Sequence, residues 1–346
     1  MLSVYTVERS TEWDDIVRSF SKYDTYWLCG YVKAFQIHGE GEPLLFYYDD
    51  GCGTRAINVV MKRDIAGCKS FCGALPENTY FDFSTPYGYG GWLIEGENTA
   101  ELFGAYELWC KNNNIVSEFV RFHPVVDNHV AAAQAYETVE LGYVVTMDLS
   151  SKETLYANIT SKNRNVIRKA QKNGVKIYNG RFEEIFREFR EVYNETMDKD
   201  NADSYYYFGE EFYKSIVEDL PYNAQMFYAV YEGRVIAASI MLMANGMMNY
   251  HLSGSRREFS SLAPTNLLLY EAALWGCHNG YKTLYLGGGV GSAEDSLFKF
   301  KKAFYRQDDP NRFVIGKKIF NSEIYDRLVS MREDVSESGF FPKYRA

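Results

Sequence analysis

Hydrophobic and polar positions follow the same order in both halves of the chain. In the first half they predict a hairpin, a strand, a helix and a strand, at 44–48 with 56–61, 80–83, about 99–112, and 117–122. In the second half they predict the same elements at 227–231 with 235–243, 248–252, about 265–279, and 283–286. Two copies of one unit explain this order. We therefore expect two domains, over residues 1–147 and 148–346.

Further helices are expected outside the two copies. Apolar positions at helical spacing predict a helix within 11–38, two helices within 181–220, and a helix with a loose tail at 320–346. Ser150 and Glu153 have the spacing of a capping box, which predicts that another helix starts there.

The composition narrows the class of protein. With 46% apolar and 24% charged residues, the 346-residue chain has the make-up of a globular protein. The net charge of −9 argues against general nucleic-acid affinity, although it leaves room for a local basic groove. The 29 tyrosines favour a wide amphipathic binding cleft, and they can equally fill cores.

Metal sites and membrane spans are not expected. The six cysteines, Cys72 among them, form no Cys-x-x-Cys pair, and the five histidines have no metal-ligand spacing. The N-terminus lacks the basic start and apolar core of a signal peptide, and no run of about 18 apolar residues could cross a membrane. We therefore expect a cytoplasmic protein with reduced thiols and no zinc site.

The stretch at 283–304 is the first candidate for chemistry. A strand ends in the glycines Gly287, Gly288, Gly289 and Gly291, and a lysine-rich helix follows. Glycines let the backbone approach a ligand closely, and helix N-termini favour anions, so the stretch predicts an anion or acyl-group site. A glycine turn followed by an ordinary surface helix fits the pattern equally, because no phosphate-loop motif is present.

A second candidate is the basic stretch 161–176, which holds six basic residues and no acid. Arg164, Arg168 and Lys172 are four apart and form one stripe of a helix that Gly174 would end. Arginine forks suit phosphate, so the stripe predicts contacts to a phosphate-bearing ligand. A solvated basic face that complements the helix dipole is an equally good explanation.

The order of elements resembles the fold of acetyl-CoA-dependent N-acetyltransferases (GNAT), although the loop at 256–264 lacks the glycines that bind the CoA pyrophosphate in that family. Over roughly residues 20–325 the chain resembles the FemAB-type transferases in their short form, without a coiled-coil arm. The motifs that carry this resemblance are Pro86-Tyr87-Gly88-Tyr89-Gly90-Gly91, Arg121-Phe122-His123-Pro124, the basic helix 161–174, Tyr250-His251-Leu252-Ser253 with Pro264-Thr265-Asn266, and Leu286-Gly287-Gly288-Gly289 with Phe300-Lys301-Lys302. The resemblance implies an α+β fold of two tandem GNAT-like domains, each a mixed sheet flanked by helices.

The resemblance also implies acyl transfer to an amine and gives roles to residues. Lys301, at the family's Phe-Lys position, would stabilise the oxyanion or the leaving ribose. Asp295 and His251 are candidate bases, although Asp295 can instead cap the following helix and His251 can be a core histidine. The residues implied in substrate binding are Arg164, Arg168, Lys172, Lys33, Tyr250, Gly287, Gly288, Gly289, Tyr87 and Tyr89.

Members of the FemAB-type family add amino acids from aminoacyl-tRNA to the peptide stem of cell-wall precursors. The implied donor is aminoacyl-tRNA or acetyl-CoA as a co-substrate, with no tightly bound cofactor. The implied acceptor is a cell-wall precursor or a surface-glycan intermediate such as a sugar nucleotide, and a lipid-linked acceptor would bring the protein to the membrane surface. Two alternatives remain open: an acetyl-CoA-dependent sugar N-acetyltransferase and a non-catalytic scaffold that binds a sugar nucleotide.

Overall fold

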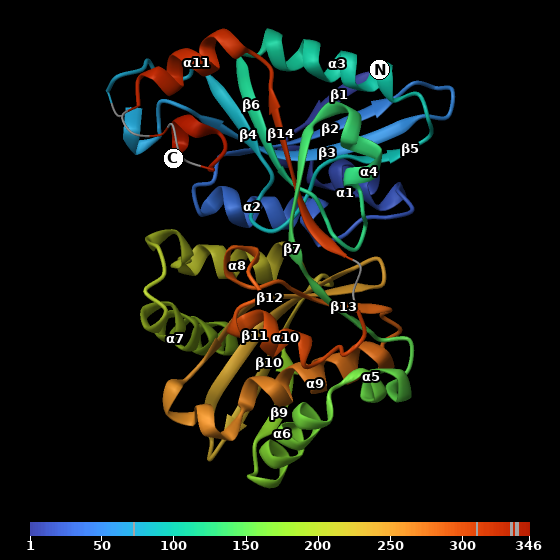
Figure 1. Ribbon diagram of the computed structural model, residues 1–346, viewed down its shortest axis with the longest axis vertical. Coiled ribbons are helices and arrows are strands. Elements are labelled where there is room, and N and C mark those ends of the chain that lie inside the picture. The colour runs from blue at the N-terminus through green and yellow to red at the C-terminus, as the bar shows by residue number, and fades with distance from the viewer. Residues whose placement is uncertain (72, 309–310, 333–334, 336–338) are drawn as a thin grey trace. The chain divides into compact units, whose positions relative to one another are not determined.

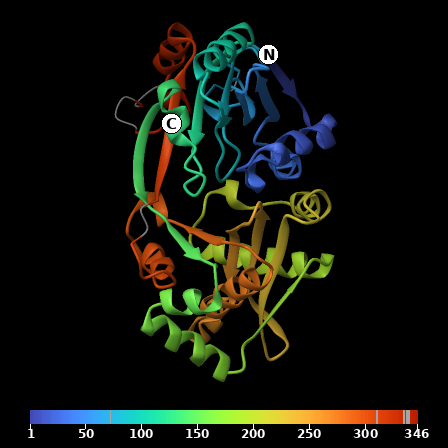
Figure 2. The ribbon, with the colours of Figure 1, turned by 90° about the vertical axis from the view of Figure 1, so that its right-hand side faces the viewer.

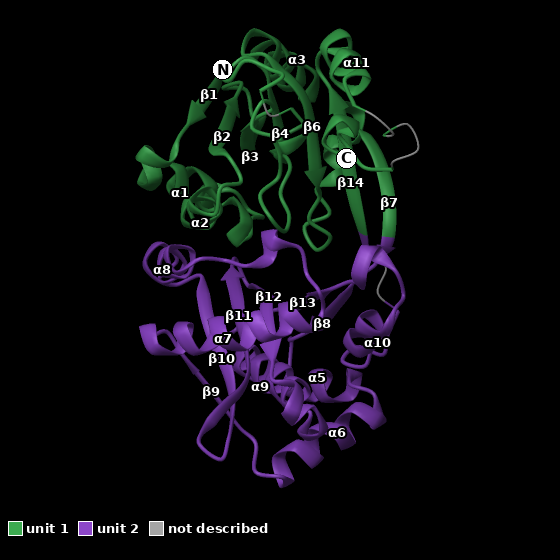
Figure 3. Ribbon diagram, turned by 90° about the vertical axis from the view of Figure 1, so that its left-hand side faces the viewer, with its two compact units in different colours: residues 1–141, 313–346 green, residues 142–312 purple. Residues whose placement is uncertain are grey.

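The computed structural model describes residues 1–71, 73–308, 311–332, 335 and 339–346. The chain forms two compact units, residues 1–141 with 313–346 and residues 142–312 (Figure 3). Each unit has its own mixed β-sheet flanked by helices, which confirms the predicted α+β class and its tandem arrangement. The predicted division assigned 313–346 to the second domain, whereas these residues pack in the first unit.

The first unit is built on a sheet with the order β1-β2-β3-β4-β6-β14-β7, in which β5 also pairs with β3 (Figure 1). Its strands are β1 (Leu2–Tyr5), β2 (Glu42–Asp49), β3 (Arg55–Asp64), β4 (Phe81–Ser84), β5 (Leu93–Glu95), β6 (Ile115–Arg121), β7 (Glu137–Tyr143) and β14 (Arg312–Ile319). Its helices are α1 (Ser10–Ser19), α2 (Cys29–Ile37), α3 (Thr99–Asn112), α4 (His129–Ala132) and α11 (Ser322–Ser330). The helix predicted within 11–38 is two helices, because Asp24 caps a 3₁₀ turn at Thr25–Trp27 between them.

The second unit is built on a sheet with the order β8-β13-β12-β11-β10-β9. Its strands are β8 (Val145–Asp148), β9 (Lys176–Gly180), β10 (Ala224–Tyr231), β11 (Arg234–Ala244), β12 (Met247–Ser255) and β13 (Thr283–Gly287). Its helices are α5 (Lys152–Asn158), α6 (Ser161–Lys172), α7 (Glu183–Lys199), α8 (Glu210–Asp219), α9 (Pro264–His278) and α10 (Ser296–Lys302). Helices α7 and α8 cover one face of this sheet, and α5, α6 and α9 cover the other (Figure 2).

Two tight turns set the register of β10, β11 and β12. Glu232 and Gly233 join the first pair of strands, and Asn245 and Gly246 join the second. All four residues have φ between +46° and +78°, the backbone of type I′ turns, whose twist matches that of the flanking strands. Strands β10, β11 and β12 therefore pair in long antiparallel ladders, and β12 in turn pairs in parallel with β13.

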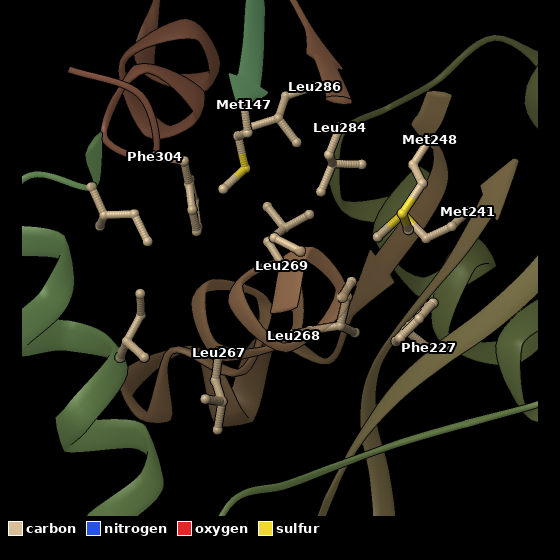
Figure 4. Packing of buried hydrophobic residues seen from close by; sticks show 14 of the residues in the cluster. Met147, Phe227, Met241, Met248, Leu267, Leu268, Leu269, Leu284, Leu286 and Phe304 are labelled. Carbon is tan, nitrogen blue, oxygen red and sulfur yellow. The ribbon is translucent and has the colours of Figure 1, made fainter. Parts of the chain in front are cut away.

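The core of the second unit lies between its sheet and α9. Leu269 points from α9 toward Leu284 and Leu286 of β13, and Leu268 points toward Phe227, whereas Leu267 extends from the opposite side of the helix (Figure 4). The alternation of Leu284, Tyr285 and Leu286 puts the two leucines on this face, as period-2 patterning predicts. This packing fixes the end of β13, where the glycine run begins.

The two copies exchange a strand. Strand β8 follows β7 of the first unit in the chain, yet it pairs antiparallel with β13 in the second sheet. Strand β14 follows α10 of the second unit, yet it pairs antiparallel with β6 in the first sheet. The order of hydrophobic runs in the sequence could not predict these pairings, because the hydrophobic pattern of β8 or β14 does not depend on which sheet the strand joins.

Two further predictions are corrected. The helix cap is Ser151, not Ser150, because the Ser151 hydroxyl accepts a hydrogen bond from the Thr154 N–H at 3.0 Å. The described end of the chain is not a loose tail. Tyr344 is fully buried, and its hydroxyl lies 3.0 Å from the Asp82 carboxylate and 2.8 Å from Ser117 Oγ.

Candidate functional site

The ladder between β12 and β13 ends before either strand does. The two strands pair in parallel from Met247–Thr283 to Asn249–Tyr285, and no pair follows, although β12 continues to Ser255 and β13 to Gly287. Just beyond the last pair, His251 is the extra residue of a β-bulge, since Leu252 faces Ile240 and Tyr250 faces Met241. Bulges of this kind bend a strand and are frequent beside active sites.

The glycine run turns the chain from β13 toward α10. Gly287 has φ +80°, and a Cβ placed on it would lie 3.4 Å from Lys301 Nζ. A Cβ on Gly288 would lie 2.9 Å from the Tyr143 carbonyl oxygen, and one on Gly289 would lie 2.0 Å from the Ala293 carbonyl oxygen. Gly288 and Gly289 are therefore required by the turn itself, whereas Gly287 adjoins the lysine.

Lys301 is the buried cation of this region. Its side chain lies on α10, the residue is 8% exposed, and its Nζ donates a hydrogen bond to the Gly288 carbonyl at 2.6 Å. Burial lowers the pKa of Lys301 to about 8, and the nearby Asp295 carboxylate acts in the opposite direction. The ammonium is therefore the main form at neutral pH, and it lies in surroundings where a charge acts strongly.

Asp295 caps α10. Its carboxylate accepts hydrogen bonds from the Phe298 N–H at 2.8 Å and the Val290 N–H at 3.2 Å. The Phe298 bond is the main cause that holds the pKa of Asp295 below its usual value. Of the two roles that the sequence left open, this geometry favours the cap, because a carboxylate with both oxygens engaged and a lowered pKa is a weak base.

His251 and Tyr250 are neutral at physiological pH. Burial lowers the pKa of His251 to about 3 and raises the pKa of Tyr250 to about 12. A histidine with so low a pKa accepts a proton poorly from an ammonium group. The two side chains are better suited to hydrogen bonding at the end of the ladder than to carrying charge.

Two of the three members of the predicted basic stripe brace α5 against α6. Arg164 donates to the carbonyls of Tyr156 and Ile159, at 3.0 Å each, and its guanidinium stacks over the Tyr156 ring. Arg168 donates to the Tyr156 hydroxyl at 2.7 Å. Lys172 is exposed at the far end of α6. The stripe exists, but its arginines already have structural partners.

The connection from β12 to α9 differs from a glycine loop. A 3₁₀ helix at Arg257–Leu262 leads to Ala263, which has φ +52°, and Pro264 is the first residue of α9. Proline has no N–H, so the first turn of α9 presents one donor fewer to an anion. The stretch 256–264, which lacks glycines in the sequence, thus forms a 3₁₀ helix and a proline-started helix instead of a glycine loop.

The remaining predicted residues belong to the first unit. Tyr87 stacks on Phe35 of α2, with ring centres 5.6 Å apart, and Tyr89 packs edge-on against His123 at 5.4 Å. Lys33 is half-buried on α2. Tyr87 and Tyr89 thus belong to an aromatic group in the first unit, while Lys301, Asp295 and Gly287 lie together in the second.

Three ionisable side chains beside this aromatic group were not among the predicted site residues, although His123 stands in one of the motifs that carry the resemblance. His123 Nε2 lies 2.9 Å from the Asp24 carboxylate, and both side chains are buried. His123 Nδ1 accepts from the N–H groups of Val125 and Val126, so the proton is on Nε2 and points at Asp24. Glu40 accepts from the Tyr87 N–H at 3.1 Å, and burial raises its pKa to about 7 against the influence of Arg121.

Tyr285 was also missed, and it lies in the second unit. Tyr285 is 3% exposed. A Cβ placed on Gly287 would lie 3.9 Å from the Tyr285 hydroxyl and 3.4 Å from Lys301 Nζ. The alternation along β13 was a signal for it, because Tyr285 must face away from the leucine core.

The described residues contain no group of three or more side chains that could hold a metal ion. Cys72 lies outside the described residues, and the other five cysteines are free thiols. Among the described residues, none of the helices combines the length and the apolar character that a membrane span requires.

Residues 161–302 match the family model described as an acetyltransferase (GNAT) domain. The solved structure of FemX is similar with a TM-score of 0.67 at 14% identity, over 94% of this chain and 99% of that one. L-PGS from Bacillus licheniformis is similar with a TM-score of 0.53 at 13% identity, over 82% and 86% of the two chains. A tandem GNAT protein from the clavulanic acid biosynthesis pathway is similar with a TM-score of 0.50 at 9% identity, over 93% and 99%.

None of the curated proteins matches the chain. The resemblance to tandem GNAT-fold transferases of the FemAB type is confirmed at the level of the fold. The match to the acetyltransferase (GNAT) domain model lies within the second unit.

Proposed function

We propose that the protein is an N-acyltransferase that moves an aminoacyl group from aminoacyl-tRNA, or a related acyl group, to an amine of a cell-wall precursor or surface-glycan intermediate. The observation that carries the proposal is the buried ammonium of Lys301, 2.6 Å from the Gly288 carbonyl at the end of β13. Acyl transfer develops negative charge on the carbonyl oxygen of the donor. A preorganised cation in a partly dry site stabilises that charge.

In the proposed step, the neutral acceptor amine attacks the carbonyl carbon of the donor ester. The C–N bond forms, the tetrahedral oxyanion accepts a hydrogen bond from Lys301, and the C–O bond to the leaving ribose breaks. The amine gives up one proton and the leaving oxygen takes up one. Because the pKa values of Asp295 and His251 are both low, the leaving alkoxide is the stronger base for that proton.

The β12–α9 connection supports an aminoacyl ester over acetyl-CoA as the donor. A GNAT site that binds CoA directs backbone N–H groups at the pyrophosphate, and here Pro264 removes one of them. The aromatic side chains Tyr87 and Tyr89, with Lys33 on α2, support a sugar-nucleotide acceptor on the first unit, since aromatic rings stack on sugars and bases and a lysine pairs with phosphate.

The GNAT family match favours a second candidate, an acetyl-CoA-dependent sugar N-acetyltransferase. A transfer assay separates the two. The protein is incubated with a UDP-linked muramyl-peptide and, in separate reactions, with tRNA charged with radiolabelled amino acids or with radiolabelled acetyl-CoA. Label passing to the acceptor from tRNA is the expected result.

Transfer from acetyl-CoA alone would replace the proposal with the second candidate. Thermal stabilisation by UDP-sugars without transfer from either donor would overturn both and leave a non-catalytic scaffold.

A further inference from the structure

A second segment of the chain lies along the glycine run. Val145 pairs with Gly287 at the start of the run, and Gly142 lies against Ser292 just past its end. We call residues 142–145 the connecting segment, because the chain enters the second unit at Gly142. The connecting segment therefore flanks the whole glycine run.

The contact at Gly142 leaves no room for a side chain. A Cβ on Gly142 would lie 2.0 Å from the Ser292 carbonyl oxygen and 2.9 Å from the Ser292 Cβ. Carbon and oxygen atoms in contact lie about 3.3 Å apart, so an alanine at position 142 would displace Ser292 by about 1 Å. Gly142 is not among the glycines with a positive φ, so the close approach alone requires a glycine here.

The connecting segment is held in place by the end of the second unit. The Arg312 guanidinium stacks over the Tyr143 ring at 4.1 Å and donates to the Tyr143 hydroxyl at 2.7 Å. The Val144 N–H donates to the Asn311 carbonyl at 3.3 Å. Because the connecting segment is anchored in this way, a forced displacement at Gly142 would fall on the glycine run.

The glycine run in turn holds Lys301. The Gly288 carbonyl accepts a hydrogen bond from Lys301 Nζ at 2.6 Å, and the Val290 N–H donates to Asp295, the cap of α10, at 3.2 Å. Ser292, two residues later, has φ +66°, a conformation that leaves a serine little freedom to adjust. A shift of Ser292 therefore reaches both the carbonyl that Lys301 binds and the start of its helix.

We propose that the connecting segment positions the transfer site, and that Gly142 sets the distance between this segment and the glycine run. Gly142 is a positioning residue, since it acts through Ser292 and the glycine run on Lys301. The inference rests on the proposed function for the role of Lys301. It implies that the residue at which the chain enters the second unit also fixes the place of the transfer lysine.

The titration of Lys301 tests the positioning role without any turnover. Protein labelled with [ε-¹³C]lysine is titrated by NMR, and the Lys301 signal is assigned by its absence in Lys301→Met. In Gly142→Ala we expect the Lys301 midpoint to rise by about half a pH unit or more, because burial lowers this pKa and a displaced loop admits water. Gly209→Ala is the matched control. Gly209 caps α8 in the same unit, and a Cβ there meets nothing within 4 Å, so the midpoint should not change.

Transfer kinetics measure the consequence for the reaction. Gly142→Ala should lower kcat at least tenfold and change the KM for the donor less than twofold, because a misplacement of about 1 Å acts on the reacting geometry. Ser292→Gly removes the side-chain carbon and frees the backbone at this positive φ. Gly142→Ala combined with Ser292→Gly should therefore recover at least threefold of the lost kcat, which a general loss of stability would not allow.

Tyr143→Ala provides a milder variant. It keeps the contact at Gly142 and removes the stacking of Arg312, so the Lys301 midpoint should rise by a smaller amount. An unchanged midpoint in Gly142→Ala, or in Tyr143→Ala if Gly142→Ala does not fold, would overturn the positioning role, as would equal effects of Gly142→Ala and Gly209→Ala. A raised midpoint in a protein that transfers from neither donor would support the positioning role and overturn the proposed function alone.

Discussion

The two units repeat one scaffold but end their parallel ladders differently. In the second unit, the β12–β13 ladder stops at Asn249–Tyr285, and Lys301 lies against the glycine run that follows β13. In the first unit, the loop after β4 continues along β6. The Thr85 N–H donates to the Phe119 carbonyl, the Gly90 N–H donates to the Arg121 carbonyl, and Gly90 bridges to Phe122.

The residues that follow β6 and β13 explain the difference. After β13 come glycines and a lysine-bearing helix, whereas after β6 comes a turn fixed by His123, whose ring binds Asp24 and two backbone N–H groups. The backbone after the β12–β13 ladder therefore lacks the strand pairing that continues after the β4–β6 ladder of the first unit. On the proposed function, the transfer chemistry belongs to the copy whose ladder ends early, while the other copy keeps a bonded loop beside its aromatic side chains.

The largest expected effect is at the lysine of the open ladder. Lys301→Met should lower kcat/KM for acyl transfer at least 100-fold while the Tm changes little, because it removes a cation that acts on the oxyanion. Lys299→Met is the control, since Lys299 is exposed on the same helix and should retain activity. Equal activity of the two variants would remove Lys301 from the mechanism.

The pH profile should report the same lysine. The pKa of Lys301 is about 8, so the active ammonium is present below that pH and is lost above it. We expect kcat to fall about tenfold per pH unit above pH 8, and Lys301→Arg, which stays charged, to lack this fall. A rate that rises through pH 8 would instead identify the neutral amine as a base.

A pair of glycines separates scaffold from site. Gly91 of the first unit has φ +87°, and a Cβ there would lie 2.8 Å from Val120 Cγ1, so Gly91→Ala should lower the free energy of unfolding by about 2 kcal/mol. The atom nearest to the new Cβ of Gly287→Ala would be Lys301 Nζ, the flexible end of that side chain, at 3.4 Å. We therefore expect Gly287→Ala to lower the free energy of unfolding by about 1 kcal/mol and to cause a loss of transfer. Urea unfolding and the transfer assay check both. A larger stability loss for Gly287→Ala would contradict the comparison.

The smallest effect concerns Glu40 of the first unit. Burial raises its pKa from 4.5 to about 7, so the folded protein binds more protons than the unfolded chain between these pH values. The free energy of unfolding should therefore fall as pH rises from 4.5 to 7. Glu40→Gln should be more stable than the unmodified protein by on the order of 1 kcal/mol above pH 7, with the difference vanishing below pH 4.5. Urea unfolding below pH 4.5 and above pH 7 measures this difference in stability. A difference that does not change with pH would show that it does not come from the raised pKa of Glu40.

Much of the scaffold could be predicted from local patterns. Alternation located β10, β11, β12 and β13, and the Gly287 run followed by Asp295 marked a strand end and a helix start. The exchange of β8 and β14 could not be predicted, because alternation does not say which sheet a strand joins. The pairs Asp24–His123 and Glu40–Tyr87 join residues far apart in the chain, so no spacing in the sequence indicates them.

The sequence by itself determined the repeat, the turns and the lysine at position 301, because periodicity, glycine and capping residues act over a few neighbouring positions. Only the tertiary structure decided that this lysine is buried beside a ladder that has ended, that Arg164 and Arg168 are already engaged, and that Gly142 lies against the end of the glycine run. Burial, pKa and this close contact depend on which distant segments pack against one another, and that is a property of the folded chain.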